Sequence, residues 1–214
     1  MSLPLDPTWT DAIWRSPFRL RFQLSTAGEK SDGGNYINMF TSSFDRAREL
    51  ARSALGPGPP LAIVADFAAA TWKIHIDENE KAFPDSFAAL ADMGVPTDGA
   101  EAIWSGYFDP GSEQDGEAVS CEHRAVRVTW DQADILLCND IAQEIGVRPR
   151  APLLSKLVDR GRGIVVDAYD DRGMDITALT AEPIQHLYQQ YGAWLLDYDL
   201  PRMTEAFGPP PARS

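Results

Sequence analysis

The alternation of apolar and polar residues is strictest near the N-terminus, where it predicts a strand over residues 18–24. Every second side chain there is apolar, and the side chains between them are polar. A period of two is that of a strand with one face in the core. The inward side would consist of Phe18, Leu20, Phe22 and Leu24, and the outward side of Arg19, Arg21 and Gln23.

A different spacing begins at Tyr36 and predicts a helix that ends at Gly56. Apolar residues recur there every three or four positions, as on one face of a helix. Similar spacing marks several later segments, most of them bounded by a capping residue, a proline or a helix-ending glycine. These helices are expected around Phe87–Ala91, Asp131–Ile145, Ile184–Leu195 and Pro201–Phe207, with Asp131 or Asp134 as the N-cap of the second.

Short apolar or alternating segments predict the remaining strands. A polar, glycine-containing loop is expected over residues 26–35, and a turn at Asp159–Gly163, where two glycines can adopt positive φ. The predicted strands are Leu61–Phe67, Trp72–Ile76, Ile103–Phe108, His123–Trp130, Leu153–Val158 and Ile164–Tyr169.

The order of these elements predicts the fold class. Strands come mostly in consecutive pairs separated by single helices, which favours hairpins over repeated crossover units. We therefore expect an α+β protein with a mostly antiparallel sheet and helices packed against it. Neither an internal repeat nor a long linker divides the chain. The sequence predicts one domain over residues 1–207 and a disordered proline-rich tail over residues 208–214.

The charge of the chain limits the kinds of partner it can bind, and its cysteine content indicates in which cellular compartment it is found. A net charge of -13 disfavours nucleic acid and anionic membrane surfaces, which are bound through clustered lysine and arginine. It favours a basic protein partner, or it serves solubility alone. The two cysteines form no CxxC motif, and neither an export signal nor a membrane span is apparent. We expect a cytoplasmic protein, and the sequence predicts no oligomeric state.

Compact catalytic motifs are missing from the sequence. It contains no phosphate-binding loop, no GxGxxG, no GxSxG and no HExxH. The three histidines, His75, His123 and His186, are isolated from one another, so each is expected to be a surface or sheet-lining side chain. We therefore predict no catalytic residue, no metal ligand and no cofactor from motifs.

Acidic residues are most concentrated between Val165 and Phe207. This segment contains eight acidic residues and only two arginines, Arg172 and Arg202. Gathered carboxylates can bind Mg²⁺ or Ca²⁺, or can separate their pKa values for acid–base catalysis. The calcium-loop pattern fails, because aligning Gly173 with its glycine places Ala168 at the first ligand position. The acids are Asp167, Asp170, Asp171, Asp175, Glu182, Asp197, Asp199 and Glu205.

A structural interpretation of the same residues stays open beside the functional one. An Asp-Asp-Arg-Gly sequence leaving a strand is typical of a turn, with aspartates bonded to nearby backbone and Arg172 paired with a carboxylate. Gly173 would then adopt a left-handed conformation. Trp194 would anchor the core, and residues 197–199 would cap the next helix.

These residues also resemble a known family. The sequence from Tyr169 to Asp175, YDDRGMD, followed by Leu187-Tyr188 and by WLLDYD at residues 194–199, resembles the bacterial domain of unknown function 3885. Residues 18–24 and Arg46-Ala47 are similar to the upstream part of such proteins. The resemblance implies a bacterial protein whose family has no established activity. An immunity protein facing a basic nuclease toxin would benefit from this acidic charge.

Two functional hypotheses follow from the sequence. The first is a non-enzymatic protein-binding or immunity-like accessory protein. The second is a metal-assisted hydrolase that uses Asp170, Asp171 and Asp175 with a distant histidine. The candidate binding residues are Asp170, Asp171, Arg172, Asp175, Trp194, Asp197 and Asp199.

Overall fold

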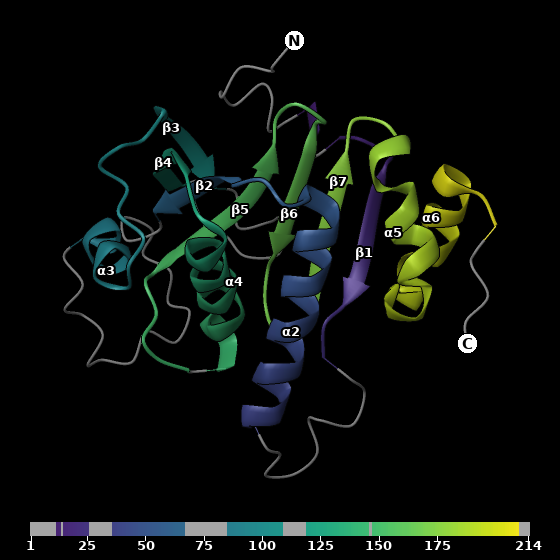
Figure 1. The fold of residues 1–214 in the computed structure, drawn as a ribbon, viewed down its shortest axis with the longest axis horizontal. Helices are drawn as coiled ribbons and strands as arrows, with labels where there is room; N and C mark the ends of the chain where they lie inside the picture. Colours follow the sequence, from purple (N-terminus) through teal and green to yellow (C-terminus); the bar gives the residue numbers. More distant parts are fainter. Residues whose placement is uncertain are drawn as a thin grey trace.

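A computed structural model describes residues 12–13, 15–25, 36–66, 85–108, 119–145 and 147–209. All of its named strands form a single seven-stranded sheet in the order β1-β7-β6-β5-β2-β4-β3, and every neighbouring pair is antiparallel (Figure 1). The predicted α+β class is confirmed. The strands are β1 Arg19–Gln23, β2 Leu61–Asp66, β3 Ala102–Phe108, β4 Val119–Arg127, β5 Leu153–Asp159, β6 Ile164–Ala168 and β7 Gly173–Ala178.

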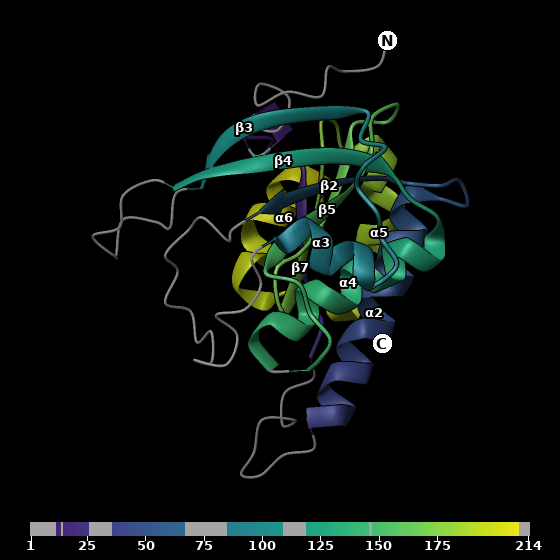
Figure 2. The same cartoon turned by 90° about the vertical axis from the view of Figure 1, so that its left-hand side faces the viewer.

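Two long helices, α2 (Tyr36–Leu55) and α4 (Trp130–Ile145), cover one face of the sheet (Figure 2). The buried residues of α2 recur at the predicted helical spacing and pack on Leu20 and Phe22 of β1 in the main core. Helix α3 (Ser86–Asp92) is capped by the side chain of Asp85, which accepts from two backbone N–H groups. The pattern of apolar residues therefore predicted these three helices, although Tyr36, at which the predicted apolar face of α2 begins, is 65% exposed.

The start of α4 differs from its prediction. Trp130, expected on strand β4, is the first residue of the helix. Its cap is Thr129 rather than Asp131 or Asp134. The Thr129 hydroxyl accepts from the Gln132 amide at 3.2 Å, and the Gln132 side chain accepts from the Thr129 amide at 3.0 Å. This reciprocal capping box satisfies two orphan donors, so the aspartates are not needed.

Strand β7 was not predicted, because the polar sequence around residue 171 was interpreted only as a strand exit. The turn after Tyr169 instead closes a further hairpin, in which β6 pairs with β7. Met174, Ile176 and Ala178 face the core and alternate with polar residues, so the strand signal was present. Its polar side is also buried, since Asp175 and Thr177 are each 3% exposed.

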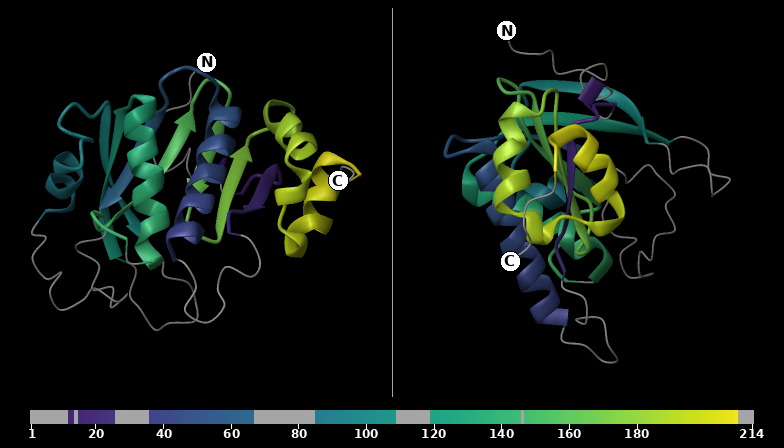
Figure 3. Two further views of the ribbon diagram at one scale, coloured as in Figure 1. Left: turned by 60° about the horizontal axis from the view of Figure 1, so that its bottom comes forward. Right: turned by 90° about the vertical axis from the view of Figure 1, so that its right-hand side faces the viewer.

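The C-terminal segment is more broken than the single helix expected over Ile184–Leu195. It contains a 3-10 turn (η2, Glu182–Ile184), the short helix α5 (Gln185–Gln190) and a second 3-10 turn (η3, Gly192–Trp194). Leu195 is extended and bridges to Phe22 of β1. A third 3-10 turn (η4, Asp197–Asp199) leads into the predicted final helix, α6 (Leu200–Phe207). These elements lie beyond β1 at the edge of the sheet (Figure 3).

Several predictions lie outside the described residues. They are the loop at 26–35, the strand Trp72–Ile76 with His75, and most of the tail. Gly146, which was expected to end the helix predicted over Asp131–Ile145, also lies outside them. In the described ranges, no helix is both long enough and apolar enough to span a bilayer.

Candidate functional site

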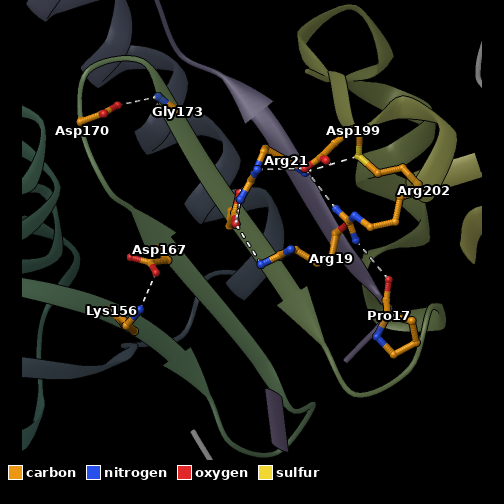
Figure 4. A network of polar contacts seen from close by, with 11 residues as sticks. Pro17, Arg19, Arg21, Lys156, Asp167, Asp170, Gly173, Asp199 and Arg202 are labelled. Atoms are coloured by element: carbon orange, nitrogen blue, oxygen red, sulfur yellow. Dashed lines mark hydrogen bonds and ion pairs between the residues drawn. The ribbon is translucent and has the colours of Figure 1, made fainter. Parts of the chain in front are cut away.

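A row of four charged side chains crosses the sheet on the face away from α2 and α4. Arg21 of β1 is the register partner of Asp175 of β7, which is also the partner of Asp167 of β6. Lys156 of β5 forms an ion pair with Asp167. Arg21 alternates along its strand with Leu20 and Phe22, which face the helices, so the row faces the other way. We call these four residues the charged row (Figure 4).

Each carboxylate of the charged row is held by a cation on its outer side. Arg21 grips Asp175 with two hydrogen bonds, Nε to Oδ1 at 2.9 Å and Nη2 to Oδ2 at 3.1 Å. Lys156 donates to Asp167. The Asp175 side chain is only 4% exposed. Burial raises the pKa of the Asp175 carboxyl, and the hydrogen bonds and charge of Arg21 offset only part of that effect.

The C-terminal segment closes the outer edge of β1. Leu196 N–H donates to the Arg21 carbonyl at 2.9 Å, and Arg202 donates to the Arg19 carbonyl at 3.1 Å. The Arg21 amide donates to the Met203 sulfur at 3.4 Å. Arg21 also reaches outward to Asp199, at 3.1 Å from Nη1 to Oδ2. An edge strand with unpaired backbone groups invites association, so these contacts protect the sheet.

The turn between β6 and β7 is organised by Asp170. One of its oxygens accepts from the backbone N–H groups of Arg172 at 2.7 Å and Gly173 at 3.1 Å. Its other oxygen is bound by the Arg172 guanidinium. The carbonyl of Asp171 accepts from Ser43 of α2 at 2.7 Å, which fixes the turn to that helix. The turn chemistry expected from the sequence is therefore present.

Gly173 serves a purpose different from the predicted left-handed conformation, because its φ is not positive. The Tyr169 ring lies directly over it, and a Cβ on Gly173 would stand 1.9 Å from the Tyr169 hydroxyl oxygen. Burial, with the charge of Asp175 nearby, raises the pKa of Tyr169 to about 12. The glycine lets the aromatic ring close over the polar side of β7.

We predict that Gly173→Ala costs about 1 kcal/mol of unfolding free energy, because overpacking carries a penalty of this order and the end of the Tyr169 side chain can yield. In a Tyr169→Ala background the same substitution should cost nothing, since the ring that occupies the space is gone. Urea denaturation of the four proteins measures this coupling. An equal cost in both backgrounds would contradict the assigned role of Gly173.

The structure separates the seven predicted binding residues into distinct places. Arg21 joins Asp175 and Asp199, while the turn holds Asp170, Asp171 and Arg172. Trp194 contacts Arg46 of α2, whose Cζ lies 5.1 Å from the ring centroid. Asp197 is exposed. Asp199 makes no capping hydrogen bond to α6, contrary to the expected role of residues 197–199, because its carboxylate faces Arg21 and Arg202.

Sequence reasoning missed the cations that organise these acids. Arg21 was treated only as part of the polar side of a strand, and Lys156 was not singled out, although alternation along a strand predicts which residues share a face. It also missed Asp140 of α4, a fully buried carboxyl bonded to Ser155 of β5. Which polar residues become neighbours depends on strand order, and the sequence pattern does not specify strand order.

The carboxylates of this region are poorly placed to bind a metal or a substrate, because they are bonded to other groups of the same chain. The oxygens of Asp170 and Asp175 already accept from guanidinium or backbone donors. Within the part of the chain that the structure describes, no three His, Cys, Asp or Glu side chains gather as a metal site would require. Of the described histidines, His123 stacks on Trp104 with ring centroids 5.2 Å apart, and exposed His186 contacts the Ser53 carbonyl.

These contacts define a class of protein: an α+β domain with one antiparallel sheet, whose C-terminal motif fastens a hairpin and an edge strand together. The chain belongs to the family described as Domain of unknown function (DUF3885), whose model matches residues 10–199. The resemblance noted in the C-terminal motif thus extends over most of the chain. Comparison with curated proteins and with solved structures finds no match.

Proposed function

We propose that this protein binds a basic protein partner without catalysing a reaction, and that Asp197 and Tyr198 form part of the contact surface. The observation that carries the proposal is the exposure of Tyr198, which is 86% accessible although it lies in an ordered turn. Aromatic residues on a fixed support are frequent energetic anchors of interfaces. Asp197 beside it supplies a negative charge.

The turn that carries Tyr198 is held in place before any partner arrives. The Asp199 amide donates to the Leu196 carbonyl at 3.1 Å, and the Asp199 carboxylate pairs with Arg21 of the charged row. Leu196 is itself bonded to β1. When the backbone is already held in one conformation, less conformational entropy is lost on binding, which favours affinity.

The charge distribution supports a basic partner. Nine lysine and arginine side chains in the described ranges form ion pairs with carboxylates of the same chain. Those cations are engaged within the fold, and the chain as a whole carries a net charge of -13. Such a field accelerates encounter with a positively charged protein. An immunity-like role in a bacterium, with a basic toxin as the partner, is the specific form of this proposal.

The hydrolase hypothesis receives less support from the geometry. It needs Asp170, Asp171 and Asp175 to converge on one metal or water. Asp170 is bound in its turn, whereas Asp175 is bound to Arg21 on the sheet face. These two carboxylates hold the hairpin turn and the edge strand.

We predict that a photo-crosslinking phenylalanine derivative at position 198 captures a basic protein in the native host. The same derivative at Tyr36, which is also exposed, provides the matched control. The captured protein should then bind the purified chain more weakly as salt rises, and more weakly still after Asp197→Asn. A partner captured equally from position 36, or one whose binding ignores both salt and Asp197, would overturn the proposal.

A further inference from the structure

A cleft of about 400 Å³ opens at the end of the sheet away from the turn that holds Asp170. One wall is the connection from α2 to β2, including Gly58, Pro59 and Pro60, and the other is the β5–β6 hairpin at Asp159–Gly161. In Figure 1 this connection passes beside the hairpin at the top of the sheet. The volume falls within the range of small-molecule sites.

Both walls are fixed by hydrogen bonds. On the first, the Pro60 carbonyl accepts from the Val128 amide at 3.1 Å, and the Pro57 carbonyl accepts from the Trp130 indole at 3.3 Å. On the second, Asp159 accepts from the Gly161 amide at 2.9 Å and from the Arg162 amide at 3.0 Å. A cleft between two fixed walls needs little ordering to receive a ligand.

The charged side chains that line the cleft are two arginines and one aspartate, in a protein whose net charge is -13. The two arginines are Arg127 and Arg160. The Asp159 carboxylate also lines the cleft, but it is bonded to Arg162 and to the hairpin backbone.

Arg127 can also serve a ligand, although Glu101 pairs with it at 3.0 Å. The two side chains are 54% and 36% exposed. An ion pair this open to water contributes little stability, so an incoming anion can share the guanidinium at little cost.

We infer that this cleft binds a small anion carrying a carboxylate or phosphate group, held between Arg127 and Arg160. Arginine presents several donors in one plane, which matches both kinds of group. The inference goes beyond the proposed protein-binding function and uses none of the same residues. The net charge of -13 repels anions from the rest of the surface. Binding at this cleft should therefore be confined to one place and should saturate.

The test is a titration of the whole chain with inorganic phosphate, and in a separate arm with succinate, at constant ionic strength set by chloride. Amide NMR spectra should show saturable shifts at Gly58 and Gly161. Affinity for the anion that binds should fall about five- to ten-fold in Arg127→Gln and in Arg160→Gln, because charge-assisted hydrogen bonds are lost. Arg48→Gln, which removes the same charge from the exposed surface of α2, should leave the affinity unchanged.

The two arms identify the chemistry of the ligand. Localised binding of phosphate alone assigns a phosphate site, and binding of succinate alone assigns a carboxylate site; both results support the inference. It is overturned if neither anion gives saturable shifts, if the shifts lie elsewhere, or if Arg48→Gln weakens binding as much as the two cleft variants. The shifts in the unmodified protein locate the site even if a variant is poorly folded.

Discussion

Replacing Arg21 with glutamine should lower the unfolding free energy by about 3 kcal/mol, the lower end of the loss seen when one partner of a buried ion pair is removed. Arg21 is the residue that binds both Asp175 and Asp199. Without it, the buried Asp175 carboxylate keeps Arg19 as a cation, at 3.7 Å. In a chain of this length the loss corresponds to a melting temperature roughly 6 to 12 °C lower.

The matched controls are Asp175→Asn and the double variant, in which both members of the ion pair are replaced by neutral side chains. Asp175→Asn alone should destabilise the protein, because the Arg21 guanidinium loses its bidentate partner. The double variant Arg21→Gln with Asp175→Asn should lose at least about 1 kcal/mol less than the two single losses added together, as coupled residues do. Urea denaturation at pH 7 measures all four proteins. Additive losses would show that Arg21 does not stabilise the fold through Asp175.

The same substitution tests whether Arg21 fastens the C-terminal segment to the sheet. Leu196 N–H is bonded to the Arg21 backbone, and Asp199 is bonded to its side chain. Amide hydrogen exchange should accelerate at Leu196 in Arg21→Gln, while exchange in the α4 helix should change only as far as the global stability does. If hydrogen exchange accelerated equally across the chain, the substitution would have lowered global stability without releasing the C-terminal segment from β1.

The sequence predicted elements more reliably than it predicted their contacts. Local spacing was enough to place α2, α4 and six of the strands found in the structure. It also placed Asp170 and Arg172 in a turn, because the aspartate bonds only to residues two and three positions away. Interactions that span a few residues are encoded by those residues alone.

The partners of Asp175 and Asp199 could not be found in that way. Each carboxylate meets Arg21, which is more than 150 residues distant in sequence from both. The contact exists because β1 pairs with β7 at one edge of the sheet, so it depends on a strand that had not been recognised. A C-terminal motif that resembled a ligand site is therefore, in large part, the attachment point of an N-terminal strand.

Asp140 presents the same problem in the core. It lies on α4 with 1% of its surface exposed, and its two oxygens accept from Ser155 of β5, at 2.5 Å from the hydroxyl and 3.2 Å from the amide. Burial raises the pKa of Asp140 well above its usual range, and the charge of Asp167 on the other face of the sheet adds to the rise. The carboxyl therefore joins helix to sheet at an electrostatic cost that depends on pH.

Asp140→Asn is expected to become increasingly more stable than the unmodified protein as pH rises. The folded state binds the Asp140 proton more tightly than the unfolded chain does. The unfolding free energy therefore decreases as pH rises from the ordinary pKa of 3.8 to the raised pKa of the folded state. Above the raised pKa, the contribution of Asp140 to the unfolding free energy no longer changes with pH. Asparagine keeps an acceptor for the Ser155 amide and a donor for its hydroxyl, and it does not titrate.

Asp140→Ala should lose about 3 kcal/mol, because it leaves the buried Ser155 amide without its acceptor and opens a cavity. Denaturation of both variants from pH 4 to pH 8 measures these effects, with exposed Asp131→Asn as the control for removing a charge from α4. The advantage of Asp140→Asn over the unmodified protein should grow with pH and then level off. A constant difference, or one that shrinks as pH rises, would mean that the buried carboxyl is not held protonated by the fold.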